Sequence, residues 1–236
     1  MVDVESGDNV LKAKKEEALT RGTLLYEYTR DVLTLKQNIN IAVDLGGGDG
    51  SNLALLETFG ANVSNGFVID VNPILLYRKY QYLKLDISKD KLPFSDSSVD
   101  LVLLIEVLEH LLNPDFTLLE IKRILSESGI AIIATPNLAW WPNIILLALG
   151  YQPIFTEVST RKIYGKKGKE IVGHLRVFTY LSLRGLREML LDYGFKILKY
   201  KTVQTRIVLK YLKPVDLLVS KIIPRLGCNI YAVVRK

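Results

Sequence analysis

Four residues at alternate positions of one short segment form the clearest chemical pattern in the chain: Asp44, Gly46, Gly48 and Gly50. Glycines allow a tight turn and let a ligand approach the backbone. A dinucleotide fingerprint fails because its third glycine position holds Ser51, and no phosphate loop ending in Gly-Lys-Ser or Gly-Lys-Thr is present. An acidic residue ahead of the glycines suits a ligand with a cationic group better than a pyrophosphate.

The candidates for proton transfer are the two histidines, His110 and His174. Because an imidazole titrates near neutral pH, either could act as a general base toward an acceptor. Glu106, Glu109 and His110 are spaced i, i+3 and i+4, so they share one face if the chain turns helical there. With His174 they form a set of two carboxylates and two imidazoles suited to a divalent metal ion. In the alternative interpretation Glu106 lies beside the ligand, Glu109 is solvated and His110 packs under a loop.

The elements that must position these residues are short apolar runs that alternate with helical patterns. Such runs are typical of buried parallel strands, and they occupy residues 39–45, 66–70, 82–87, 100–107, 129–135, 195–203 and 229–234. One helix is predicted over 51–59 with Ser51 as its cap, and a second begins at Pro73. A third is predicted over 115–125, ended by Ser128 and Gly129, and a fourth over 179–193, followed by Gly194. Strands separated by helices indicate right-handed crossovers. We therefore expect an α/β fold with a doubly wound, seven-stranded sheet and helices on both faces.

Changes in pattern along the chain predict its organisation. Residues 1–38 are expected to form an N-terminal segment with one helix, rich in Leu, Lys and Glu over 11–35. Residues 39–236 are expected to form the main domain. Within it, residues 138–178 are an insertion or lid, and residues 205–227 are a basic segment whose apolar side chains recur at helical spacing over 214–223.

The order and spacing of motifs along residues 40–137 resemble those of class I S-adenosylmethionine (SAM)-dependent methyltransferases, and in part the ubiquinone-type O-methyltransferases. The matching motifs are the glycine loop, Pro93-Phe94-Ser95-Asp96-Ser97-Ser98-Val99-Asp100 before a strand, Glu106-Val107-Leu108-Glu109-His110 and Ala134-Thr135-Pro136-Asn137. The resemblance implies a Rossmann-like sheet that is mostly parallel with an antiparallel last strand. It also implies SAM as the cofactor.

The same resemblance implies roles for single residues. Asp70 would bind the ribose of the cofactor, Asp86 would bind the adenine amino group, and Ile87 would stack on the adenine ring. The expected cofactor site consists of Asp44, Gly46, Gly48, Gly50, Asp70, Asp86, Ile87 and Glu106.

The acceptor side points to three functions. The set of Glu106, Glu109, His110 and His174 resembles the small-RNA 2′-O-methyltransferases, but the sequence departs from them after Asn137. Residues 149–159 and 173–179 resemble uncharacterised methyltransferases linked with cell-surface glycan and lipid pathways. We therefore expect methyl transfer to oxygen on a small-molecule or lipid-linked acceptor. The alternatives are RNA 2′-O-methylation and a non-catalytic lipid- or partner-binding protein with this fold.

The net charge of +6 is concentrated in two late segments. Residues 161–176 hold six Lys or Arg against Glu170 alone, and residues 205–227 hold five against Asp216 alone, so the rest of the chain is mildly acidic. Both segments lie near apolar stretches, one of which contains the paired Trp140 and Trp141. This pattern favours an anionic or membrane-held acceptor over a nucleic acid, with a peripheral membrane contact or an apolar lid as the two interpretations of the Trp pair.

The composition of the chain narrows the classes of protein to which it could belong. Apolar residues make up 49% of the chain and charged residues 24%, which excludes a disordered chain. The single Cys228 cannot form an intramolecular disulfide, which favours a reducing compartment. The N-terminus lacks the apolar core of a signal peptide, and no apolar run approaches the roughly 20 residues of a spanning helix. We expect a cytoplasmic protein, with or without a peripheral membrane contact.

Overall fold

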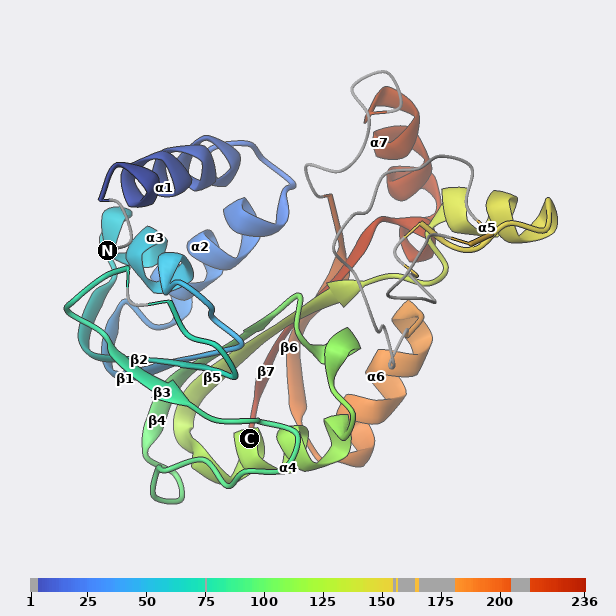
Figure 1. Cartoon of the computed structure of the whole chain (residues 1–236). Helices are drawn as coiled ribbons and strands as arrows, with labels where there is room; N and C mark the ends of the chain where they lie inside the picture. The colour runs from blue at the N-terminus through green and yellow to red at the C-terminus, as the bar shows by residue number, and fades with distance from the viewer. Residues whose placement is uncertain (1–3, 75, 155, 157–163, 166–180, 205–212) are drawn as a thin grey trace.

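A single twisted sheet forms the centre of the computed structural model, which describes residues 4–74, 76–154, 156, 164–165, 181–204 and 213–236 (Figure 1). The strand order is β3-β2-β1-β4-β5-β7-β6. The strands are β1 (Asn38–Leu45), β2 (Asn62–Asp70), β3 (Gln81–Lys84), β4 (Val99–Ile105), β5 (Leu125–Pro136), β6 (Lys196–Val203) and β7 (Asn229–Arg235). Strands β1 to β5 pair in parallel, whereas β7 runs antiparallel to both β5 and β6. The expected seven-stranded Rossmann-like sheet with an antiparallel last strand is confirmed.

Helices cover both faces of this sheet, as expected. One face packs against α1 (Val4–Ala18), α2 (Leu24–Leu35) and α3 (Ser51–Thr58), and the other against α4 (Pro114–Ile124) and α6 (Leu183–Asp192). Strand β4 shows the alternation that this requires, because Leu101 and Leu103 face the first group and Val102 and Leu104 face the second. Two further helices, α5 (Trp141–Ala148) and α7 (Lys213–Ile222), project beyond the sheet (Figure 1).

The prediction of one N-terminal helix is wrong, because two helices occupy this segment. The chain leaves the first helix after Ala18 and begins the second at Leu24. The hydroxyl of Thr23 donates to the carbonyls of Glu17 and Thr20, both at 2.8 Å, and accepts from the Tyr26 N–H. Such bonds between side chain and backbone compete with helix continuation and favour a new N-cap.

Helix α3 is not capped by Ser51. Gly50 is its N-cap, with φ of +79° and no side-chain cap bond, and the Ser51 hydroxyl instead donates to Asp49.

The predicted helix from Pro73 is also wrong. No helix occurs in the described residues between 71 and 80, because tertiary contacts take the amides that a helix would use. The N–H of Ile74 donates to the Gly48 carbonyl at 2.9 Å, and the N–H of Tyr77 donates to the Tyr82 hydroxyl at 3.0 Å.

Strand β5 begins at Leu125, directly after α4, so Ser128 and Gly129 lie inside the strand and do not end the helix. Gly194 follows the sixth helix with φ of +71°, as predicted. The amphipathic helix predicted over 214–223 is confirmed as α7. None of the helices in the described part of the chain has the length and apolar character needed to cross a bilayer.

Candidate functional site

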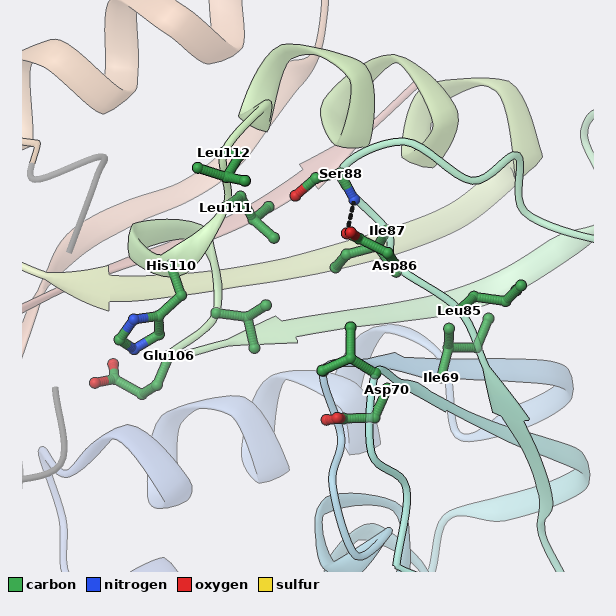
Figure 2. A pocket seen from close by; sticks show the side chains of 13 residues that line it. Ile69, Asp70, Leu85, Asp86, Ile87, Ser88, Glu106, His110, Leu111 and Leu112 are labelled. Carbon is green, nitrogen blue, oxygen red and sulfur yellow. Dashed lines mark hydrogen bonds between the residues drawn. The ribbon is translucent and has the colours of Figure 1, made fainter. Parts of the chain in front are cut away.

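A pocket of about 570 Å³ opens where the parallel strands β2 and β4 end and where the loop after β3 begins. Parallel strands place their carboxyl ends at one edge of the sheet, so residues far apart in sequence meet there. Figure 2 shows the pocket with its labelled side chains. It is lined by Gly46, Ile69, Asp70, Val71, Leu85, Asp86, Ile87, Ser88, Glu106, Val107, His110, Leu111 and Leu112.

The glycine loop is tied to Asp70 at the end of β2. The Gly48 N–H donates to Oδ2 of Asp70 at 3.1 Å, and the Asn72 N–H donates to Oδ1 at 2.9 Å. At Gly46 a Cβ would lie 2.4 Å from a methyl of Val107, so a larger residue would collide with the pocket wall. At Gly48 a Cβ would meet no atom of the described chain within 4 Å, so the backbone there is open to an approaching ligand.

Asp44 lies fully buried beneath this loop. A Cβ built on Gly47 would stand 2.5 Å from its Oδ2 atom, which accepts no hydrogen bond from the described residues. Its Oδ1 atom accepts from the Asn52 amide at 3.4 Å, and the Lys14 ammonium of α1 donates to that amide's oxygen at 2.7 Å. An unpaired buried carboxylate oxygen under an open glycine loop fits a cationic ligand group.

Burial raises the pKa of Asp44 to about 7, although the neighbouring Lys14 ammonium opposes the change. Burial also lowers the pKa of Lys14. In both residues the cost of removing the charge from water exceeds the attraction between them.

Replacing Asp44 with Asn should therefore change how stability depends on pH. The unfolded chain loses the Asp44 proton near pH 4 and the folded chain near pH 7, so the folded state binds more protons between these values. The free energy of unfolding of the wild type should fall as the pH rises through this window. Relative to wild type, Asp44→Asn should gain about 4 kcal/mol between pH 4 and pH 8. Urea unfolding at pH 4, 6 and 8 measures this difference, and a difference that stays constant would contradict a buried, perturbed carboxyl.

The residues after β3 form a second wall of the pocket. Asp86 Oδ1 accepts from the Ser88 N–H at 3.0 Å, and its Oδ2 lies 3.1 Å from the Lys89 ammonium. The backbone bond from Ser88 and the nearby Lys89 lower the pKa of Asp86, so it stays an anion at neutral pH. The buried Ile87 presents an apolar surface beside it, which suits a flat ring.

Glu106 occupies a strained position directly after β4. Its φ of +57° is rare for a residue with a side chain and costs about 1 kcal/mol or more. The Asn229 amide of β7 donates to its carboxyl. Desolvation and the charges of Glu109 and Glu17 raise the pKa of Glu106. The side chain lines the pocket beside His110, toward which it points in Figure 2.

Glu109 and His110 lie together in the short helix η1 (Leu108–His110). Glu109 is fully buried, which contradicts its expected solvation in one interpretation, and its Oε2 accepts from the Thr135 hydroxyl at 2.9 Å. Its Oε1 atom lies 3.8 Å from Nε2 of His110. Burial raises the pKa of Glu109. His110 lines the pocket, so an imidazole with a carboxyl group behind it faces the space where a ligand would lie.

The four-residue metal set is not assembled in the described part of the chain. No group of three or more His, Cys, Asp or Glu side chains there is arranged to hold a metal ion. Glu109 turns away from the pocket toward Thr135. His174, expected both as a base and as a ligand, lies outside the described residues.

Most of the expected cofactor residues meet at this one pocket. Gly46, Asp70, Asp86, Ile87 and Glu106 line it. Gly48 contacts Asp70 from the loop, and Asp44 lies beneath that loop. Gly50 caps α3 at the loop's end.

Several residues that contact the site were not expected from the sequence. Asn52 donates to Asp44 and Lys14 donates to Asn52. Asn229 donates to Glu106, and Thr135 donates to Glu109. Lys14, Asn52 and Asn229 belong to no motif, whereas Thr135 lies in Ala134-Thr135-Pro136-Asn137. The apolar lining residue Val107 lies inside the Glu106–His110 motif and Leu111 directly follows it, and this position is a signal that could have indicated them.

A family model described as a methyltransferase domain matches residues 21–200, which is more than half of the chain. A sequence search of curated proteins finds no match.

Solved structures share the fold at low identity. One is from the complex between the Haloferax volcanii Trm112 methyltransferase activator and a methyltransferase, with 20% identity, a TM-score of 0.61, and coverage of 98% of this chain and 95% of that one. A SAM-dependent methyltransferase from Archaeoglobus fulgidus has 17% identity and a TM-score of 0.55, over 90% of this chain and 93% of that one. A protein from Listeria monocytogenes, described as such a methyltransferase, has 14% identity and a TM-score of 0.59, over 89% and 97%. Identities of this size indicate a common fold.

Proposed function

The chain belongs to the methyltransferase-domain family and is a SAM-dependent methyltransferase of class I, and we propose that it methylates an oxygen atom of a small-molecule or lipid-linked acceptor. The observation that carries this proposal is the position of His110, which lines the same pocket as Asp70 and Asp86. A proton-accepting group is needed for a hydroxyl acceptor and lies here beside the proposed cofactor residues.

The pocket residues suit the parts of SAM. We assign the ribose hydroxyls to Asp70, the adenine to Asp86 and Ile87, and the cationic methionine end to the glycine loop above Asp44. When bound, SAM supplies a methyl group activated by its positive sulfonium. The side-chain oxygens of Asp70 at the end of β2 suit hydroxyl donors, and the unpaired Oδ2 of Asp44 suits an ammonium donor.

His110 would remove the acceptor's proton. The acceptor oxygen would bond to the methyl carbon while the bond between that carbon and the donor's sulfur breaks, and the electron pair of the broken bond would stay on sulfur. The O–H electrons would return to oxygen, and the proton would pass to the imidazole. Glu109 lies behind the ring, with Oε1 at 3.8 Å from Nε2, and stabilises the imidazolium that results. Glu109 is therefore a positioning residue, because its carboxyl is buried away from the pocket.

The apolar walls of the pocket mouth favour a small or lipid-linked acceptor over RNA. Leu111 and Leu112 form one side of it, and Leu112 is exposed. Polynucleotide recognition relies on cationic side chains along the phosphate backbone, and the lining residues within the described part of the chain include no Lys or Arg.

The test is to follow labelled methyl groups from SAM into three separate pools: a total lipid extract, a small-molecule extract and total RNA. We expect label in a lipid or small-molecule product, and fragmentation in the mass spectrometer should place the methyl group on oxygen. Label confined to RNA would contradict the acceptor class. A product methylated on nitrogen or carbon would contradict the oxygen assignment.

A further inference from the structure

Helices α5 and α7 expose apolar side chains that no described element covers. The exposed fractions lie between 37% and 68%, in helices of only eight and ten residues and in the residue that directly follows each helix. We call this surface the α5–α7 face, and it consists of Ile144, Ile145, Leu147, Leu149, Val215, Leu217, Leu218, Ile222 and Ile223. Large aliphatic side chains exposed on two neighbouring helices of a globular protein are typical of a contact with another apolar surface.

The two helices are held together by a buried carboxylate. Oδ1 of Asp216 in α7 accepts from the indole N–H groups of Trp140 and Trp141, at 2.7 Å and 2.9 Å. Its Oδ2 accepts from the Gln204 amide at 2.9 Å. Trp140 is buried against Cys228, so this indole belongs to a small core and is not part of the exposed face. The face is therefore carried by a fixed pair of helices.

The charges around this face have one sign. Residues 136–156 contain no charged residue. Residues 213–227 contain three Lys or Arg and a single acidic residue, Asp216, whose carboxylate is buried. Of the three basic residues, Lys221 and Arg225 are exposed, and they lie close to Ile222 and Ile223 in the chain. Exposed aliphatic groups bordered by cations match the surface of an anionic bilayer.

A short series of residue contacts connects the α5–α7 face to the pocket. The Asn229 amide donates to Glu106 in the pocket, and Cys228, the preceding residue, packs on Trp140 at the start of α5. Asn137, at the end of β5, donates to the carbonyls of Arg225 and Gly227. A surface that binds at α5 and α7 would therefore lie near the pocket.

We propose that the α5–α7 face docks on the surface of an anionic lipid bilayer. Docking itself depends only on this surface. Its consequence, that a membrane-held acceptor is presented to the pocket, rests on the proposed function. The helices insert their aliphatic side chains at the level of the headgroups, while Lys221 and Arg225 contact lipid phosphates.

Vesicle flotation of the full chain tests this docking. We expect binding to vesicles of phosphatidylcholine with phosphatidylglycerol and at least tenfold weaker binding to phosphatidylcholine alone. Leu147→Glu with Leu218→Glu should weaken binding at least tenfold, and so should Lys221→Glu with Arg225→Glu at low salt. The matched control is Leu119→Glu on α4, because Leu119 is 53% exposed and Leu147 is 51% exposed. This control should bind as the wild type does.

Titration with S-adenosylhomocysteine, the demethylated product of SAM, accompanies each sample. All four proteins should bind this compound equally, which shows that the variants are folded. Wild type that binds S-adenosylhomocysteine but no vesicle would overturn the docking proposal, as would unchanged vesicle binding by Leu147→Glu with Leu218→Glu. A dimer that this double variant dissociates, together with no vesicle binding, would overturn it in favour of a second copy of the chain. Vesicle binding without S-adenosylhomocysteine binding would support the docking proposal and contradict the proposed function.

Discussion

Gly48→Arg should weaken the binding of S-adenosylhomocysteine at least 100-fold while the protein stays folded. A Cβ at position 48 meets no atom of the described chain within 4 Å, so an added side chain occupies the open space above the loop. The Gly48 N–H donates to Asp70, so this space lies beside the carboxylate assigned to the ribose. A side chain placed there fills the volume that the ligand needs, and calorimetric titration measures the loss.

Backbone strain must be separated from this steric effect. Gly48 has φ of +53°, a left-handed conformation that costs a residue with a Cβ about 1–2 kcal/mol. Gly48→Ala carries the same strain with little volume and should weaken binding less than tenfold. Gly60→Arg is the matched control, because Gly60 also has a positive φ with open space around it and lies at the end of α3. If Gly48→Arg binds S-adenosylhomocysteine as the wild type does, the glycine loop does not border the ligand.

His110→Ala should lower kcat by a factor of about 10²–10⁴, the range for loss of a general base. Its effect on S-adenosylhomocysteine affinity should stay within about threefold, because the cofactor is assigned to Asp70, Asp86 and the loop. The measurement is methyl transfer to the acceptor found in the labelled pools. Because a general base accepts a proton only in its unprotonated form, wild-type kcat should depend on pH, and the variant should lose that dependence.

Two further variants separate removal of the proton from a change in pocket shape. Leu112→Ala alters the pocket mouth without a titratable group, so its kcat should keep the wild-type pH profile. Glu109→Gln keeps the hydrogen-bonding shape near Thr135 and removes the charge behind the ring, so it should lower kcat less than His110→Ala does. If the His110→Ala enzyme has the wild-type kcat, His110 is not the general base of the reaction.

The strand ends could be predicted from the sequence because each ends in a chemically distinct residue. Apolar runs that stop at Asp44, Asp70 and Glu106 define parallel strands, and parallel strands bring their carboxyl ends to one edge. The sheet followed from this geometry, whereas the roles expected of the pocket residues followed from the resemblance to class I methyltransferases. Asp86 lines the pocket, although β3 ends at Lys84 and is shorter than expected.

Contacts between distant segments could not be predicted, because the residues on either side of each contact carry no pattern that indicates the partner. Lys14 reaches the half-buried Asn52, which contacts the buried Asp44, from the first helix, which the sequence pattern merged with the second. Asn229 contacts Glu106 across 123 positions of sequence. Pro73 favours a helix start locally, but the Gly48 carbonyl and Tyr82 hydroxyl capture the amides that follow it. In each of these cases tertiary hydrogen bonds decide the structure.

The paired tryptophans are a further case in which the sequence did not reveal a contact between distant segments. Trp140 beside Trp141 suggested either an apolar lid or contact with a membrane interface. Both indole N–H groups donate instead to Asp216, 75 and 76 positions later. This bond turns the Trp140 ring inward and leaves the aliphatic residues of α5 and α7 as the exposed surface. The lid predicted over 138–178 stays a proposal.

The central claim is that the pocket between Asp70, Asp86 and Glu106 binds the methyl-donor cofactor. Calorimetric titration of the wild-type protein with S-adenosylhomocysteine tests it most directly, because it needs no knowledge of the acceptor. We predict saturable binding with one molecule per chain, and we predict that Asp70→Ala weakens it at least tenfold. A folded wild-type sample that releases no heat, even at high protein concentration, would contradict the claim.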